Sequence, residues 1–270
     1  MDNRVKDNWL LIAVCLIMIV FVITFIFSEV AVEDVGNVEN RYDYTFQEAL
    51  ERQLTNGTTD LRFQDGYLNR ASESDIRQAM SIDERHIFEF LHLNEKVNLT
   101  EDEVNQLLQG RGILEGQGAA FLDAQERYDI NLIYLISHAQ VETGNGSSEL
   151  AEGISPDGSG ETYYNFFGIG AFDSQAVEAG SSHAVEQNWD SPESAISGGA
   201  EFISESYVNN SQRTLYEIRW NPNNPGVHQY ATDIAWSESI AGIMERYYHD
   251  ANLETPEIER VYYQGADSGE

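Results

Sequence analysis

The stretch INLIYLISHAQVETGNG (130–146) is the most apolar helical segment of the chain, and it ends abruptly after an acidic residue. Its apolar side chains recur at intervals of three and four residues, which predicts a central helix running to Glu142. His138 and Glu142 would share one face of that helix, so the carboxylate is expected on the packed side. Gly144 and Gly146 would stop the helix and leave room for a large ligand beside the acid.

A carboxyl group in such a place can serve as an acid. Burial disfavours its charged form, and a carboxylic acid that keeps its proton can donate it to a glycosidic oxygen. The alternative is that Glu142 only accepts a hydrogen bond from a backbone amide at the helix end. His138 is interpreted as a hydrogen-bonded core histidine.

Other catalytic chemistries lack their motifs in this sequence. The histidines show no HExxH or paired-ligand spacing. There is no GxSxG or Walker motif, and the single cysteine, Cys15, lies within an apolar run. We therefore expect no metal and no organic cofactor.

The composition is strongly acidic, with 46 Asp and Glu against 15 Lys and Arg and a formal net charge of −31. A nucleic-acid partner is excluded, because a phosphate backbone needs a basic footprint. The 270 residues are enough for one catalytic domain with extensions.

An uncharged run, WLLIAVCLIMIVFVITFIF (9–27), follows the first few residues. It is long enough to cross a hydrocarbon layer of roughly 30 Å. A cleaved signal peptide is the alternative, but its apolar core is usually only about 7–15 residues long. Arg4 and Lys6 precede the run, so residues 1–8 are expected in the cytoplasm and the remaining chain outside. The prediction is a single-pass protein of the cell membrane, in which residues 9–27 contact lipid.

Beyond the predicted span, the chain divides into three parts. Residues 28–78 are predicted to be an extracellular spacer with accessory helices, such as YTFQEALERQL (44–54). Residues 79–250 are mostly helical and form the predicted catalytic domain. The Gly- and aromatic-rich segment ETYYNFFGIGAFD (161–173) suits a short strand or hairpin. Residues 251–270 are predicted to be an acidic tail. The helical periodicity and the single strand-like segment together predict a fold that is mostly α with one small β-hairpin or sheet.

Several helix boundaries are marked by local signals. Thr45 is a candidate N-cap, Thr100 has the capping-box spacing to Glu103, and Ser191 precedes a proline at the first helical position. The segment IDERHIFEFLHL (82–93) has helical periodicity. A final helix is expected from about Asp233 to Tyr248.

Four segments together resemble a known family. They are ILEGQGAAFLDAQERYDINLIYLISHAQVETGNGSSELAEG (113–153), YYNFFGIGAFD (163–173), NWDSPESAISGGAEFI (188–203) and TLYEIRWNPNNPGVHQYATDIAW (214–236). In this order they resemble the N-acetylglucosaminidase domain of Gram-positive autolysins, glycoside hydrolase family 73, in its membrane-anchored form. The resemblance runs from about 80 to 250. It implies a lysozyme-like, two-lobed fold that cuts the β-1,4 bond after N-acetylglucosamine in the glycan strands of peptidoglycan.

The resemblance also implies roles for individual residues. Glu142, within ETGNG, matches the family's catalytic general acid. Tyr230, within HQYATD, matches a tyrosine that lines the cleft and supports catalysis, and Asp173 matches an acidic residue beside the cleft. Candidates for binding sugar or lining the cleft are Gln229, Asp233, Tyr164, Asn165 and Phe167. The alternative for Phe167 is core packing, and the alternative for Asp233 is an N-cap on the last helix.

The second catalytic group is left open. Some family members carry a second glutamate on a hairpin, but Glu178 and Glu161 do not lie in convincing segments for that role. Either the N-acetyl oxygen of the substrate attacks the anomeric carbon, or Asp173 acts as a base on water. A lytic transglycosylase on the same fold and a non-catalytic wall-binding module are the other functions considered. Peptidoglycan is the expected partner, and the sequence does not identify a membrane-protein partner.

Overall fold

The computed structural model describes residues 41–57, 59–155, 160–170, 176–256, 258 and 260–265. From Tyr42 onward the chain forms one compact unit. Among the described residues, no helix is long and apolar enough to cross a membrane. The predicted cytoplasmic segment 1–8 and the predicted span 9–27 lie outside the described residues.

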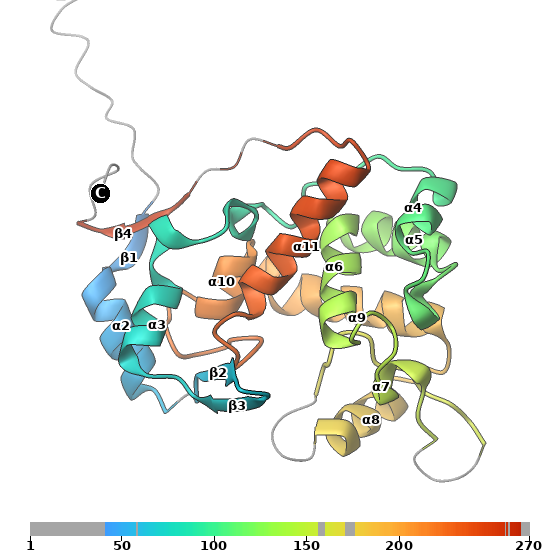
Figure 1. Ribbon diagram of the computed structural model, residues 1–270, viewed down its shortest axis with the longest axis horizontal. Helices are drawn as coiled ribbons and strands as arrows, with labels where there is room; N and C mark the ends of the chain where they lie inside the picture. The colour runs from blue at the N-terminus through green and yellow to red at the C-terminus, as the bar shows by residue number, and fades with distance from the viewer. Residues whose placement is uncertain are drawn as a thin grey trace, which may run out of the picture. The chain divides into compact units, whose positions relative to one another are not determined.

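The unit is mostly helical, as predicted, with small sheets (Figure 1). In chain order its elements, with η marking short 3-10 helices, are β1 (Arg41–Thr45), α2 (Phe46–Thr55), β2 (Leu61–Gln64), β3 (Tyr67–Arg70), α3 (Glu73–Met80), η1 (Ile82–Glu84), η2 (Ile87–Phe90), α4 (Glu101–Leu107), η3 (Gly112–Leu114), α5 (Gly118–Tyr128), α6 (Leu132–Glu142), α7 (Glu149–Glu152), α8 (Ala176–Glu186), α9 (Pro192–Ser206), η5 (Val208–Asn210), α10 (Leu215–Trp220), α11 (Trp236–Asp250) and β4 (Tyr262–Gln264).

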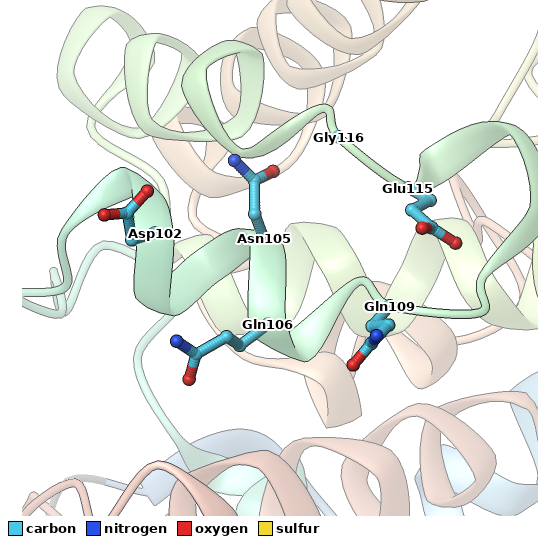
Figure 2. Close-up of a pocket in the computed structure, with 6 residues that line it drawn as sticks. All are labelled: Asp102, Asn105, Gln106, Gln109, Glu115 and Gly116. Carbon is cyan, nitrogen blue, oxygen red and sulfur yellow. The ribbon is translucent and has the colours of Figure 1, made fainter.

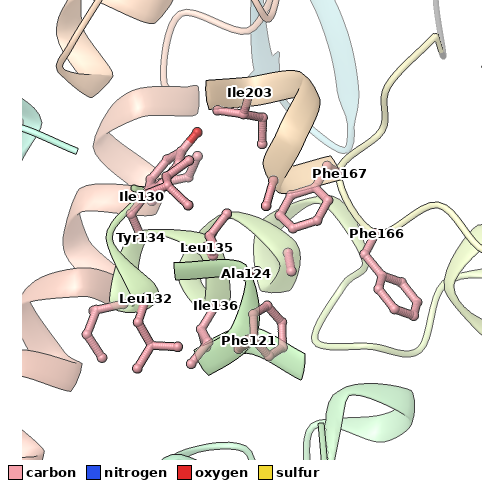
Figure 3. Close-up of a cluster of buried hydrophobic side chains, with 14 of the residues drawn as sticks. Phe121, Ala124, Ile130, Leu132, Tyr134, Leu135, Ile136, Phe166, Phe167 and Ile203 are labelled. Atoms are coloured by element: carbon pink, nitrogen blue, oxygen red, sulfur yellow. The ribbon is translucent and has the colours of Figure 1, made fainter. Parts of the chain in front are cut away.

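Helix α6 is the predicted central helix, and its residues from Leu132 to Gln140 are all buried. It packs between α5 and α11 (Figure 1). Asn131 caps its first turn by accepting a hydrogen bond from the backbone N–H of Tyr134 at 2.8 Å. Its apolar side chains lie in a hydrophobic cluster with Phe121, Phe167 and Ile203 (Figure 3). A helix that is apolar all round belongs in a core, so the end of α6 is a fixed point for the site.

A second hydrophobic cluster includes Tyr42, Leu50, Met80, Tyr216 and Tyr263. It therefore joins the start of the described chain to α10 and to the final strand. Residues on both sides of the predicted boundary at residue 79 bury side chains in this cluster. The segment predicted as an acidic tail contains β4 and buries Tyr263.

The strands differ in place from the prediction. β1 pairs with β4, and β2 pairs antiparallel with β3 so that Phe63 lies opposite Leu68. The hairpin predicted within 161–173 is wrong for the described part of that segment, which has only an isolated bridge between Tyr163 and Ile154. Its glycines Gly168 and Gly170 have φ angles of +65° and +77°. Such left-handed residues turn the chain and do not continue a strand.

The predicted N-caps are confirmed. The side chains of Thr45, Thr100 and Ser191 each accept a hydrogen bond from the backbone N–H three residues later. The segment 82–93 differs, because it forms only the short helices η1 and η2. There the Glu89 carboxylate accepts a hydrogen bond from the backbone N–H of His86 at 3.1 Å. This contact caps the start of η2, so the chain begins a new short helix and does not continue a long one.

Candidate active site

Glu142 is the last residue of α6, as the sequence predicts. The helix closes with hydrogen bonds from the Thr143 N–H to the Ala139 carbonyl at 3.0 Å and from the Asn145 N–H to the Gln140 carbonyl at 2.9 Å. The N–H of Gly146 then donates to the Thr143 hydroxyl oxygen at 2.8 Å. These bonds satisfy backbone groups that a helix end leaves open, and they fix the direction of the Glu142 side chain.

Of the two glycines after Glu142, Gly144 leaves open space as predicted and Gly146 does not. A Cβ on Gly146 would lie 2.1 Å from the Arg111 carbonyl oxygen, so this glycine allows two backbone segments to touch and does not make room for a ligand. Gly144 has open space, with no atom closer than 4.0 Å to an added Cβ. The glycine that makes room for the carboxylate is Gly168, where a Cβ would lie 2.7 Å from Oε2 of Glu142. The sequence analysis missed this residue, although it lies in the quoted FFGIG segment.

The two carboxylate oxygens of Glu142 have different surroundings. Oε1 accepts a hydrogen bond from the indole N–H of Trp236 at 2.8 Å and lies 3.5 Å from Nε2 of His138. Oε2 lies on the side of Gly168. The side chain is 24% exposed, so the expected burial is corrected: the carboxyl group is accessible to a ligand. Trp236 is a further residue that the sequence analysis missed.

His138 lies beneath the carboxylate and is fully buried. The Tyr134 hydroxyl and Nδ1 of His138 are 3.1 Å apart and share a hydrogen bond. The rings of Phe167, Tyr230 and Trp236 meet the imidazole edge-to-face at centroid distances of 5.4, 4.8 and 5.2 Å. Nε2 faces Glu142 without forming a hydrogen bond. The prediction of a hydrogen-bonded core histidine therefore holds for one ring nitrogen, and the other is available to the carboxylate.

Tyr230 is brought to the same place from the loop before α11. Its ring stacks on Trp236 at a centroid distance of 5.2 Å, and its hydroxyl donates to the Phe167 carbonyl at 2.6 Å. Burial raises the pKa of Tyr230 well above its usual range, and the negative charge of Glu142 raises it further. The phenol therefore stays neutral, and its ring and Trp236 form an aromatic wall beside the acid.

Comparison with known proteins identifies this arrangement. Residues 118–249 match the glucosaminidase family model, described as mannosyl-glycoprotein endo-beta-N-acetylglucosaminidase. The bifunctional autolysin of Staphylococcus epidermidis is 47% identical over 191 residues, which are 67% of this chain and 14% of that protein. Autolysin E of Staphylococcus aureus in complex with the muropeptide NAM-L-ALA-D-iGLU is 48% identical, with a TM-score of 0.76 over 83% of this chain and 98% of the other.

The chain belongs to the glucosaminidase family.

A second structure of the same autolysin E, a catalytic mutant in complex with the disaccharide NAG-NAM, matches with 48% identity and a TM-score of 0.76 over 83% of this chain and 99% of the other. The prediction of a family 73 glycoside hydrolase with a lysozyme-like glucosaminidase fold is confirmed at the level of the family. The chain spans about one seventh of the length of the bifunctional autolysin.

Two of the predicted sugar-binding residues of the glucosaminidase are buried. Phe167 is 0% exposed, which agrees with the alternative of core packing, and Asn165 is 2% exposed. The Asn165 amide donates to the Ile169 carbonyl at 2.8 Å, and its side-chain oxygen accepts from the Ile169 N–H at 3.2 Å. The Asn165 side chain therefore holds the turn that carries Gly168. Tyr164 is partly exposed, with its ring centroid 6.0 Å from that of Phe166.

Gln229 and Asp233 also have structural partners in the glucosaminidase fold. The Gln229 amide donates to Oε1 of Gln53 at 2.8 Å and to the Trp220 carbonyl at 3.0 Å. The Asp233 carboxylate accepts from the Ala235 N–H at 3.0 Å, just before α11. Asp233 therefore forms a turn and is not the N-cap, because α11 begins at Trp236 after Ala235. Both side chains are partly exposed and lie beside the segment that carries Tyr230 and Trp236.

That segment is held by a buried ion pair. Arg219 and Asp60 meet at 2.6 Å, and neither side chain is more than 4% exposed. Arg219 also donates to the carbonyls of Asp233 at 2.8 Å and Thr232 at 3.1 Å. Burial lowers the pKa of its guanidinium group, and Asp60 opposes that shift. A buried pair tolerates loss of one partner poorly, so this contact fixes the loop that supplies the aromatic wall.

The candidates for a second carboxylate lie in different segments. Asp173 lies outside the described residues, and Glu178 lies in α8. Glu161 is exposed and accepts a hydrogen bond from the Tyr163 hydroxyl at 3.0 Å. Among the described residues, no group of three or more His, Cys, Asp or Glu could hold a metal ion.

A separate hollow of about 480 Å³ lies along α4 and the segment after it. Its side chains point in different directions, with Gln106 and Gln109 turned away from Asn105 (Figure 2). Two of them bind backbone: Asn105 accepts from the Gly118 N–H at 2.9 Å, and Glu115 accepts from the Gly110 N–H at 2.8 Å. The hollow is a polar surface whose lining residues do not include Glu142 or its neighbours, and it does not gather groups around one ligand position.

Proposed function

We propose that the chain is an endo-β-N-acetylglucosaminidase that hydrolyses the β-1,4 bond after N-acetylglucosamine in the glycan strands of peptidoglycan. The placement of Glu142 carries the proposal: it is a partly exposed carboxyl group at the end of a buried helix, fixed by Trp236. Membership of the glucosaminidase family and the NAG-NAM complex of a relative support the substrate class.

In the proposed mechanism, one oxygen of Glu142 carries the proton. Oε1 already accepts the hydrogen bond from Trp236, so Oε2 is the oxygen that carries the proton when the group is neutral. General acid catalysis transfers this proton to the glycosidic oxygen as the bond from that oxygen to the anomeric carbon breaks. The Trp236 N–H then stabilises the carboxylate that remains.

His138 supports the same proton transfer by limiting the position of the Glu142 carboxyl group. When the Tyr134 hydroxyl donates to Nδ1, the ring proton of a neutral imidazole lies on Nε2. Nε2 is 3.5 Å from Oε1 of Glu142, so a small movement of the carboxylate would complete a hydrogen bond. His138 is in this scheme a positioning residue for the acid, held in place by the rings around it.

Tyr230 faces the charge that develops on the sugar. Its hydroxyl proton is engaged by the Phe167 carbonyl, so the oxygen offers a lone pair to a positively charged transition state. The attacking group is either the N-acetyl oxygen of the substrate or a water activated by Asp173. Tyr230 would orient the acetamido group in the first route and stabilise the transition state in both.

The test of the proposal is mass spectrometry of the products that the full-length protein, in detergent, releases from purified peptidoglycan. Products with N-acetylglucosamine at the reducing end, each heavier by one water than an anhydro-sugar, would support hydrolysis of the proposed bond. Anhydro products would instead favour the lytic transglycosylase alternative, in which no water is added.

A matched variant separates an enzyme from a binding module. Glu142→Gln keeps the size of the side chain but cannot donate the proton. We expect it to lose about 100- to 10,000-fold in kcat, the usual contribution of general acid catalysis, while still binding glycan. Full activity in this variant would contradict the assignment of Glu142 and leave the wall-binding function in its place.

We also propose that residues 9–27 tether the enzyme to the cell membrane, with residues 1–8 in the cytoplasm and the catalytic unit outside. The length of the apolar run and the preceding Arg4 and Lys6 support this. Such a tether would restrict cutting to strands close to the bilayer. Protease added to intact cells should remove a tag at the C-terminus and spare one at the N-terminus. The opposite pattern would contradict the orientation.

A further inference from the structure

The β2–β3 hairpin exposes three large apolar side chains. Phe63, Tyr67 and Leu68 are 63%, 74% and 55% exposed. Phe63 lies opposite Leu68 and Gln64 lies opposite Tyr67. Directly opposed residues share a face and neighbours alternate, so Phe63 and Leu68 form one apolar face and Tyr67 lies on the other. A two-stranded hairpin is only marginally stable by itself, and exposed apolar groups that adjoin one another often mark a binding surface.

The base of this hairpin is bonded to the segment that forms the aromatic wall. The Leu61 N–H donates to the Thr232 carbonyl at 2.9 Å, and the Ile234 N–H donates to the Leu61 carbonyl at 2.9 Å. Asp60, the residue before β2, holds Arg219 at 2.6 Å. The hairpin is thus tied to residues 232–234, immediately before the Trp236 that binds Glu142.

A cavity of about 300 Å³ lies where the hairpin meets α3 and the start of α11. Its lining includes Phe63 and Ala235 together with the charged residues Arg62, Arg85 and Glu238. The size is at the lower end for small-ligand sites. One apolar ring among charged hydrogen-bonding groups suits a sugar, which has an apolar C–H face and polar hydroxyl groups around its edge.

We infer that the Phe63–Leu68 face and this cavity bind sugar units of the glycan strand beyond those held at Glu142. The inference rests on the proposed function. Continuity of the hairpin with the Trp236 segment favours the glycan strand as occupant. A second copy of the chain is disfavoured because both would carry a net charge of −31, and an anionic lipid surface is disfavoured for the same reason. The hairpin therefore gives the enzyme a preference for long strands.

The test compares peptide-free glycan strands of two lengths, tetrasaccharides and strands of about ten disaccharides, as substrates of the full-length protein in detergent. The measured quantity is the ratio of kcat/KM for the long strand to that for the tetrasaccharide. Phe63→Ala with Leu68→Ala should lower this ratio by about three- to tenfold, the effect of losing one aromatic contact. Tyr67→Ala is the matched control, because it removes an exposed aromatic ring from the opposite face and should leave the ratio within about twofold of the wild type.

Four results would overturn the inference: a wild-type enzyme without length preference, an unchanged ratio in the double variant, an equal fall in Tyr67→Ala, or an equal loss on both substrates. If the double variant does not fold, Phe63→Gln gives the same comparison with a smaller change. A wild-type protein that cuts neither strand would overturn the proposed function as well. An active enzyme with an unchanged ratio would overturn only the role of the hairpin.

Discussion

At the scale of single residues, the Glu142 carboxyl group is confined from two sides. Trp236 and His138 lie at Oε1, and the missing side chain of Gly168 makes room at Oε2. The first side supplies one hydrogen bond, from the Trp236 N–H, and the second supplies space for the acid and its substrate. The two sides can be altered separately.

Gly168→Ala should displace the acid. The new Cβ would lie 2.7 Å from Oε2 of Glu142, and misplacement of a catalytic group by about 1 Å can cost about 100-fold in rate. We expect kcat to fall by about 10- to 100-fold, measured on peptidoglycan. Gly170→Ala is the control, because it also has a left-handed φ but its Cβ would meet His183. Equal loss of kcat in both variants would show that backbone strain alone is responsible.

His138→Phe keeps a ring among the aromatic neighbours but removes Nε2. Without Nε2 at 3.5 Å from Oε1, the Glu142 carboxyl group loses a neighbour that limits its position, so kcat on peptidoglycan should fall while KM stays close to the wild-type value. The free energy of unfolding should fall by about 1–3 kcal/mol, because the buried Tyr134 hydroxyl loses its partner. Tyr134→Phe breaks the same hydrogen bond and leaves Nε2 in place. If His138→Phe lost no more kcat than Tyr134→Phe, His138 would be only structural.

At the scale of elements, the end of α6 depends on close backbone packing. The Gly146 carbonyl accepts from the Ile113 N–H at 3.2 Å, and Gly146 has no space for a side chain against the Arg111 carbonyl. The loop at 111–113 therefore clamps the turn that follows Glu142. Stability and activity are coupled at this point of the fold.

Gly146→Ala should be far more destabilising than Gly144→Ala. Both glycines have left-handed φ angles, +79° and +54°, so either alanine costs about 1–2 kcal/mol in backbone conformation. Only Gly146 adds a clash, which costs about a further 1–3 kcal/mol. Urea unfolding of the two variants would measure the difference. Equal free energies of unfolding would contradict the clamp.

The sequence allowed α6 and its acid to be predicted because both depend on local periodicity. The N-caps at Thr45 and Thr100 were predictable for the same reason. The turn at Gly168 was not, because aromatic and β-branched residues there favour a strand, while Asn165 satisfies the backbone of a turn instead. Trp236 was missed because its partner lies 94 residues away in the chain, and no local pattern marks such a contact.

At the scale of the whole molecule, both hydrophobic clusters contain tyrosines or have them packed against them. Tyr134 and Tyr230 lie near the site, and Tyr216 joins the second cluster. Burial raises the pKa of each of these phenols well above the usual value. Burial also raises the pKa of Tyr207 to about 12. The folded protein therefore holds these protons at a pH where the unfolded chain releases them.

These raised pKa values determine how the free energy of unfolding changes at alkaline pH. Tyrosines of the unfolded chain ionise near pH 10, at about their usual pKa, so their contribution is fully present below that pH. It is lost as the pH rises above about 10, and for Tyr207 the loss extends to about 12. The denaturant midpoint should be flat from about pH 8 to 9 and fall above about 10. A midpoint that rises over that last interval would contradict the prediction.

The pairing of β1 with β4 closes the compact unit at its two extremities. The Gln264 side chain donates to the Tyr42 carbonyl at 2.9 Å, and the Tyr263 and Tyr216 hydroxyls are 3.0 Å apart. Because β1 and β4 are hydrogen-bonded to each other, the loss of one strand leaves the other without its partner. A protease that trims residues 262–265 would thus loosen residues 41–45 at the start of the described chain, and the trimmed protein would be digested more readily at both strands.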